Sequence, residues 1–245
     1  MRLQAHAEEP AVRRDPQQDL SPAEGIPHAP AATLASAICA RMRAEILSGE
    51  RRPHARIRLE DLKAEFSVSW SPLREALSRL VAEGLVRADE NRGYWVAPVS
   101  RAEMADITRM RMAMESMAVR LAIEHGDDAW EAGLLAAYHR LSKFEARRQK
   151  KADAEQWEHW HREFHDAVAR GCHSPILLQF CAQLQDQFAR YRKLFLAVNP
   201  FDKRVPGEHK ALLEAAIARN ADKACAIIEE HIGRTGRNIL AAIKE

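Results

Sequence analysis

The spacing of apolar residues between positions 32 and 84 predicts three short helices. Four apolar residues recur at every fourth position and predict a first helix that ends before Gly49: Leu34, Ile38, Met42 and Ile46. A second helix is predicted around Leu59, Leu62 and Phe66. After a turn at residues 67–70, Ser71 and Pro72 predict the start of a third helix, capped by Ser71, that ends at Gly84. Two short helices joined by a tight turn predict a helix-turn-helix.

The pattern changes period after Gly84. Residues 85–87 and 94–96 flank the turn-rich segment 89–93 and predict a β-hairpin. A basic connector is expected at residues 51–58, between the first two helices. A helix-turn-helix followed at once by a hairpin is the winged variant. Its third helix enters the major groove of DNA, and its hairpin tip lies against the neighbouring backbone or minor groove.

From residue 100 onward the pattern is helical throughout. Ser100 and Glu103 form a capping box and predict a helix that starts directly after the hairpin and runs to about His125. Five further helices are predicted at about residues 127–148, 152–170, 174–199, 206–219 and 222–244. The fold class is therefore mainly α: a winged helix-turn-helix of three helices and a hairpin, then an all-α antiparallel bundle of six helices.

Length and composition are compatible with this division. The 245 residues allow two modest domains, predicted at 32–99 and 100–245, after an N-terminal tail at 1–31 that lacks periodicity and is expected to be disordered. No apolar run is long enough to span a membrane, and the cysteines, widely separated, are expected to be reduced core thiols: Cys39, Cys172, Cys181 and Cys225. We therefore expect a cytoplasmic protein, nucleoid-associated when bound to DNA.

Bulk charge does not indicate nucleic-acid binding. The net charge is +2, and residues 32–99 contain eleven Lys and Arg against nine Asp and Glu. DNA binding is therefore argued from motif and placement.

The first hundred residues resemble the GntR family of regulators. The resemblance is carried by residues 69–77 (SWSPLREAL), by Leu80, by residues 83–86 (EGLV) and by residues 91–93 (NRG). It implies that the turn, the start of the third helix and the wing contact operator DNA, here through Ser69, Trp70, Ser71, Arg74, Arg92 and Gly93.

Two positions depart from the family pattern. Trp70 stands where Arg is common, and Glu60 occupies a second commonly basic position in the preceding helix. Both lower the basic charge of the DNA-binding surface. Trp70 either contacts DNA or packs against the wing, and Arg74 either contacts DNA or pairs with a neighbouring Glu.

Histidines are the chemical signal of the helical half. His161 and His165 are four residues apart and share a helix face, while His209 and His231 lie beside apolar residues of the last two helices. Imidazoles on three helices of a bundle can enclose a metal ion. The alternative is a set of hydrogen-bonded core histidines, because eleven histidines will place some on inward faces by chance.

This half resembles the FCD ligand-binding domain of the FadR subfamily of GntR regulators. The resemblance is carried by residues 111–115, 164–166, 208–209 and 231. Many such domains bind a divalent metal through one Asp and three His, and the matching positions here are His161, His165, His209 and His231. His161 stands where Asp is usual. Four neutral imidazoles leave a divalent ion at +2, which favours an anionic ligand and an ion such as zinc or nickel.

Arg111 and Arg192 are the residues expected to bind a carboxylate effector. Arg111 projects along the inward stripe of its helix, where a carboxylate can accept from its guanidinium, although an internal pair with Glu115 would also satisfy it. Residues 115–131 are similar to glutarate-responsive, carbon-starvation-linked regulators, which narrows the expectation to a dicarboxylate.

The sequence thus predicts a homodimeric transcription regulator, of the repressor type, whose affinity for double-stranded operator DNA responds to a small organic acid bound near a metal. The alternatives are the same regulator without a metal and a metal-dependent hydrolase. We expect no enzyme activity and no membrane partner.

Overall fold

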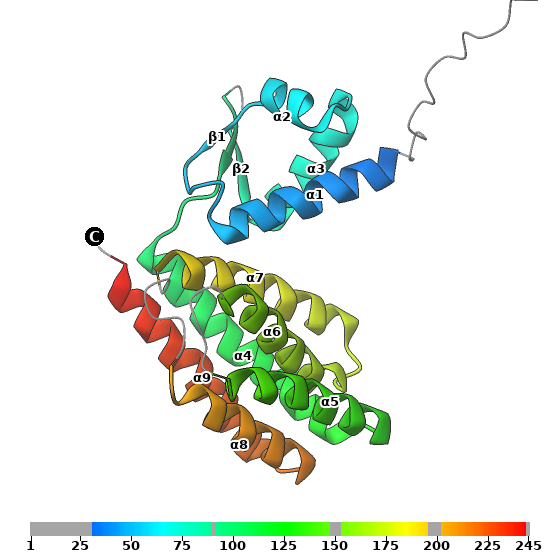
Figure 1. Ribbon diagram of the computed structural model, residues 1–245, viewed down its shortest axis with the longest axis vertical. Coiled ribbons are helices and arrows are strands. Elements are labelled where there is room, and N and C mark those ends of the chain that lie inside the picture. The colour runs from blue at the N-terminus through cyan, green and yellow to red at the C-terminus, as the bar shows by residue number, and fades with distance from the viewer. Residues whose placement is uncertain (1–30, 90–91, 148–152, 196–201, 244–245) are drawn as a thin grey trace, which may run out of the picture. The chain divides into compact units, whose positions relative to one another are not determined.

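The computed structural model describes residues 31–89, 92–147, 153–195 and 202–243 (Figure 1). The predicted tail therefore lies, apart from Ala31, outside the described residues. Within them lie nine helices and one small antiparallel sheet, which confirms the mainly α fold class. No helix in this part of the chain is long and apolar enough to cross a membrane.

Three helices and three strands make up the N-terminal part. These are α1 (Ala31–Ser48), β1 (Arg56–Ile57), α2 (Leu59–Phe66), α3 (Trp70–Ala82), β2 (Val86–Asp89) and β3 (Gly93–Val96). The predicted hairpin is confirmed by the pairing of β2 with β3, in which Val86 lies opposite Val96. Fully buried apolar side chains fill the space between the helices and the sheet, among them Met42, Leu62, Leu73, Leu77 and Leu80.

Two details of this part differ from the sequence prediction. The connector at 51–58 contains a strand, β1, which pairs with β3 so that the sheet has the order β1-β3-β2. Helix α3, the predicted DNA-recognition helix, begins at Trp70, with Ser69 in extended conformation at its N-cap, so Ser71 is not the cap. Pro72 is still accommodated in the first turn, because the backbone N–H groups there have no partner within the helix.

Six helices form the C-terminal bundle, as predicted. They are α4 (Arg101–His125), α5 (Asp128–Glu145), α6 (Ala154–Arg170), α7 (Pro175–Phe195), α8 (Val205–Ile217) and α9 (Ala221–Ala242). Helix α4 packs against α6, α7 and α9. At Gly236 the two helices α4 and α9 come so close that an added Cβ would lie 2.5 Å from the Thr108 side chain.

The predicted capping box at the start of α4 is modified by a tyrosine. Ser100 Oγ accepts from Glu103 N at 3.0 Å, as predicted. In a full capping box the Glu103 side chain would accept from Ser100 N. Here Tyr191 Oη of α7 takes that place: it accepts from Ser100 N at 2.8 Å and donates to the Glu103 carboxylate. Tyr191 thus fixes the start of α4 to α7.

Helix α7 also hydrogen-bonds to the segment that contains α3 and the wing. Gln187 Nε2 donates to the carbonyl of Glu83, directly after α3, at 2.6 Å. The fully buried Arg190 donates to the carbonyl of Ala97, directly after β3. One helix of the bundle therefore touches both the end of the recognition helix and the end of the wing.

Candidate functional site

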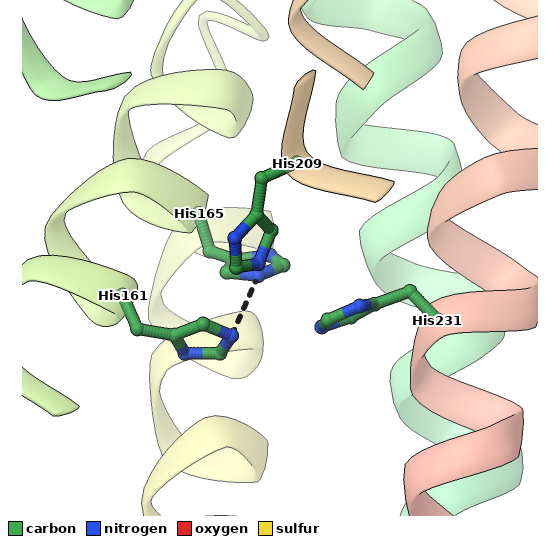
Figure 2. Close-up of side chains that lie close together, drawn as sticks. All are labelled: His161, His165, His209 and His231. Atoms are coloured by element: carbon green, nitrogen blue, oxygen red, sulfur yellow. Dashed lines mark hydrogen bonds between the residues drawn. The ribbon is translucent and has the colours of Figure 1, made fainter. Parts of the chain in front are cut away.

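The four predicted histidines meet inside the helical bundle. His161 and His165 come from α6, His209 from α8 and His231 from α9, and the four rings face one another (Figure 2). All four side chains are buried, and each offers a ring nitrogen within 4.8 Å of the others. The ε-nitrogens of His161 and His165 are 3.1 Å apart, as expected of residues on successive turns. We call these four residues the histidine cluster.

Burial favours the uncharged form of three members of the cluster, His161, His165 and His231. It lowers the pKa of His161 and His165 well below the ordinary value, and the neighbouring imidazoles and arginines lower it further. For His231 burial lowers the pKa to about 4, even though the hydrogen bond that it donates to Glu208 acts in the opposite direction. Neutral imidazoles are the form that donates a lone pair to a metal.

Carboxylates contact the outer nitrogens of two cluster members. Glu145 Oε1, at the end of α5, lies 3.0 Å from Nδ1 of His209. Glu208 Oε2 lies 2.8 Å from Nδ1 of His231. Burial raises the pKa of Glu208, but its contacts with His231 and Arg234 outweigh burial and lower it overall. These two glutamates were not among the predicted site residues.

A small cavity adjoins the cluster on the side of His161 and His165. It measures about 20 Å³ and is lined also by Arg111, Arg162, Arg192, Glu158, Gln185 and Ala189. That volume holds about one water molecule. The cavity therefore brings the two predicted effector-binding arginines next to the histidines, although it is too small for an organic acid as it stands.

Both of those arginines already have carboxylate partners. Arg111 is 2.7 Å from Glu115, the internal pair considered from the sequence, and its guanidinium lies 4.4 Å from the Phe188 ring centroid. Arg192 pairs with Glu158. Arg192 Nε and Gln185 Oε1 are nonetheless buried polar atoms without a hydrogen-bond partner in the described part of the chain.

The residues predicted to contact DNA are exposed. Ser69, Trp70, Ser71 and Arg74 lie at the start of α3, and Arg92 and Gly93 lie at the described end of the wing. Within the described residues no carboxylate pairs with Arg74, because the adjacent Glu75 pairs with Arg79 at 2.5 Å. Residues 90 and 91, at the predicted tip, lie outside the described residues.

Trp70 contacts a lysine that the sequence prediction did not include. Lys63 Nζ of α2 lies 4.8 Å from the Trp70 ring centroid, a cation–π distance. The aromatic side chain therefore holds a cation beside the turn of the helix-turn-helix.

Ion pairs divide the basic residues of the N-terminal part into two groups. Four arginines are neutralised by carboxylates within it: Arg41, Arg43, Arg51 and Arg79. The other basic residues there have no carboxylate partner among the described residues: Arg52, Arg56, Arg58, Lys63, Arg74, Arg87 and Arg92. The near balance of total charge conceals this division, which leaves unpaired positive charge on the connector with β1, on α2, on α3 and on the wing.

Comparison with known proteins places both halves in families. Residues 34–96 match the family described as bacterial regulatory proteins, gntR family, and residues 106–234 match the FCD domain. The chain is 37% identical over 216 residues to the uncharacterized HTH-type transcriptional regulator BphR of Paraburkholderia xenovorans, covering 87% of each protein. It is 38% identical over 193 residues to the HTH-type transcriptional repressor GlaR of Escherichia coli, covering 77% of this chain and 87% of GlaR.

Solved structures agree on the fold. A GntR regulator from Rhodococcus sp. RHA1 superposes with a TM-score of 0.69 at 20% identity, covering 86% of this chain and all of the other. E. coli McbR superposes with a TM-score of 0.64 at 22% identity, covering 83% and 97%. The chain therefore belongs to the GntR family of bacterial transcription regulators, with an FCD effector-binding domain, and is not an enzyme.

Proposed function

We propose that this regulator is a homodimeric repressor whose operator affinity is set by a small carboxylate effector bound beside a divalent metal. The observation that carries the proposal is the histidine cluster with an arginine-lined cavity directly next to it. Neutral imidazoles that converge in a bundle suit a metal, and a neighbouring guanidinium suits a carboxylate.

The cluster fits a metal on its own chemistry. Nε2 of His209 is buried without a hydrogen-bond partner in the described residues, which is costly unless a ligand takes its lone pair. Two nitrogens bound to one ion at about 2.1 Å are at most about 4.2 Å apart, so a cluster within 4.8 Å needs only small side-chain shifts to close. An all-nitrogen set favours zinc or nickel over harder ions.

The effector site is proposed on the side of His161 and His165. A divalent ion held by four neutral imidazoles would carry a +2 charge, which favours an effector carboxylate at any coordination position that the protein leaves open. Arg111 and Arg192 can donate to the remaining carboxylate oxygens, and Gln185 adds a polar contact. Because the cavity is only about 20 Å³, effector binding must move side chains, and a dicarboxylate such as glutarate is the ligand class we propose.

Helix α7 supports a route from this site to the DNA-binding part. Gln185, Ala189 and Arg192 line the cavity, while Gln187 and Arg190 hydrogen-bond to the ends of α3 and β3. A shift of α7 that accompanies effector binding would therefore alter the support of the recognition helix. The effector can change operator affinity only if it binds with different affinity to the protein before and after this shift of α7.

The direction of regulation and the oligomeric state are proposed from the family. GlaR, which is 38% identical over most of this chain, is named a repressor, so we propose repression relieved by the effector. A homodimer would place two recognition helices on a pseudo-palindromic operator.

Three measurements on untagged protein test the proposal: elemental analysis, thermal shift with small dicarboxylates, and binding to the DNA upstream of its own gene. We expect about one zinc or nickel per chain, stabilisation by a dicarboxylate and weaker DNA binding in its presence. Less than a tenth of an equivalent of metal, with effector response retained, would favour the regulator without a metal. Absence of DNA binding in all conditions would overturn the function.

A further inference from the structure

The four cluster histidines are not equivalent. His209 and His231 each present Nδ1 to a carboxylate, whereas no hydrogen bond joins His161 or His165 to a carboxylate in the described part of the chain. The shortest carboxylate approach to His165 is 4.0 Å, from Oε2 of Glu115, and the other oxygen of that carboxylate, Oε1, accepts from Arg111. The carboxylate contacts are therefore specific to the two single histidines on α8 and α9.

Such a contact decides which ring nitrogen is available inside the cluster. A neutral imidazole carries one proton, and a carboxylate can only accept, so the proton of His209 lies on Nδ1, opposite Glu145. Nε2 of His209 then carries a lone pair, and this is the buried atom that has no partner among the described residues. By the same reasoning His231 carries its proton on Nδ1, where it donates a hydrogen bond to Glu208, and Nε2 keeps its lone pair.

Both carboxylates are themselves held in place. Glu145 is almost fully buried, with 4% of its side chain exposed, and also accepts from Trp157 Nε1 at 3.3 Å. Trp157 in turn stacks on His161 with ring centroids 4.5 Å apart. The Glu145 carboxylate thus contacts one cluster histidine directly and supports the ring that packs on another.

Glu208 is fixed by an arginine. Arg234 of α9 is buried and pairs with both Glu208 and Asp202, the second of which lies just before α8. These contacts orient Glu208 toward His231, which lies one turn before Arg234 on α9.

We propose that Glu145 and Glu208 are positioning residues for the metal site, which hold His209 and His231 as Nδ1–H tautomers with Nε2 directed to the ion. The inference rests on the proposed metal and deepens it. A carboxylate on the outer nitrogen orients the ring and raises its basicity, and loss of such a partner typically costs 10–100-fold in metal affinity.

Competition for Zn²⁺ with a chromophoric chelator measures the zinc affinity of the full chain. The variants to compare with wild type are Glu145→Gln and Glu208→Gln. We expect each variant to bind Zn²⁺ about 10–100-fold more weakly than wild type. Glu214→Gln is the matched control, because Glu214 lies on α8 as Glu208 does but pairs with Lys210 on the exposed surface. Its affinity should stay within about threefold of wild type. If Glu145→Gln fails to fold, Glu208→Gln carries the test, because its side chain is partly exposed.

Histidine NMR of the metal-free protein tests the tautomers separately. We expect the Nδ1–H form for His209 and His231 in wild type, and an increased Nε2–H population for the histidine whose partner is replaced. If wild type binds Zn²⁺ and both variants bind it within threefold with unchanged tautomers, this inference falls while the metal site stands. If wild type takes up no Zn²⁺, the metal site and this inference fall together.

Discussion

Arg192 of α7 forms an ion pair with Glu158 of α6 at the edge of the histidine cluster. The guanidinium that we propose for the effector is thus occupied by a carboxylate of the chain itself, and the pair closes a cavity of only about 20 Å³. In the proposed site an effector carboxylate would compete with Glu158 for the guanidinium of Arg192.

Replacing Glu158 by Gln should therefore strengthen effector binding. The competitor loses its charge while Arg192 keeps its own, so a dicarboxylate such as glutarate should bind about 5–10-fold more tightly, which corresponds to roughly 1–1.4 kcal/mol. Isothermal titration of both proteins measures this. Arg192→Gln should abolish the response, and Glu155→Gln, earlier on α6, is the control. Unchanged or weaker binding by Glu158→Gln would argue against competition for Arg192.

Replacing His161 by Asp should change the metal preference. The substitution introduces a carboxylate oxygen into an all-nitrogen set, and hard ligands favour harder ions. We expect the ratio of bound Mn²⁺ to bound Zn²⁺ to rise about tenfold or more when both ions compete, as measured by elemental analysis after dialysis against the mixture. The formal charge of the ion and its ligands also falls from +2 to +1, so dicarboxylate affinity should fall in the same variant. An unchanged metal ratio would indicate that His161 is not a ligand.

The metal-free protein should lose stability as the pH falls below neutral. The unfolded chain takes up protons on its histidines near pH 6.5, whereas in the folded state burial lowers the pKa of His231 to about 4 and lowers those of His161 and His165 as well. The unfolded state therefore binds more protons below pH 6.5, and the free energy of unfolding decreases there.

Urea denaturation of chelator-treated protein at pH 7.5 and pH 5 measures this loss. For His231 alone it should amount to about 2 kcal/mol, because pH 5 lies about 1.5 units below the unfolded pKa and above the folded one. His231→Gln should show a correspondingly smaller difference between the two pH values. If the free energy of unfolding changes equally between the two pH values in variant and wild type, His231 takes up its proton as readily in the folded state as in the unfolded state.

The sequence predicted those features that depend on local spacing. The two histidines on α6 are four residues apart, so their common face followed from helical periodicity, and the apolar stripes placed six helices in the bundle. His209 and His231 were candidates because they lie beside apolar residues of their helices, and the resemblance to the FCD domain supported grouping them with the pair on α6; nothing local connects them with that helix.

The carboxylate partners could not be predicted in this way. Glu145 is separated from His209 by 64 residues, and both lie in ordinary helical sequence. Strand β1 was missed for a related reason: it has only two residues, and its pairing with β3 is a tertiary contact without an alternating pattern. Tyr191, which replaces half of the capping box, lies about ninety residues from Ser100. Contacts of this kind depend on the arrangement of helices rather than on any short stretch of chain.

The division of basic residues into paired and unpaired ones leads to a prediction about DNA binding. Arg74 and Arg79 both lie on α3, but Arg79 pairs with Glu75 and contacts Ser36, whereas no carboxylate in the described residues pairs with Arg74. Arg74→Ala should weaken operator binding by about 10–100-fold, since loss of a base or phosphate contact typically costs roughly 1–3 kcal/mol.

Titrations of the upstream DNA at several salt concentrations distinguish two roles for Arg74. A phosphate contact should lower the slope of log affinity against log salt by about one, and a base contact should instead relax sequence preference. Arg79→Ala is the matched control on the same helix. It removes an arginine that is already neutralised, so it should leave the slope unchanged even where it lowers stability. Equal effects of the two substitutions would mean that α3 binds through its overall charge, and the assignment of Arg74 as a DNA contact would then be wrong.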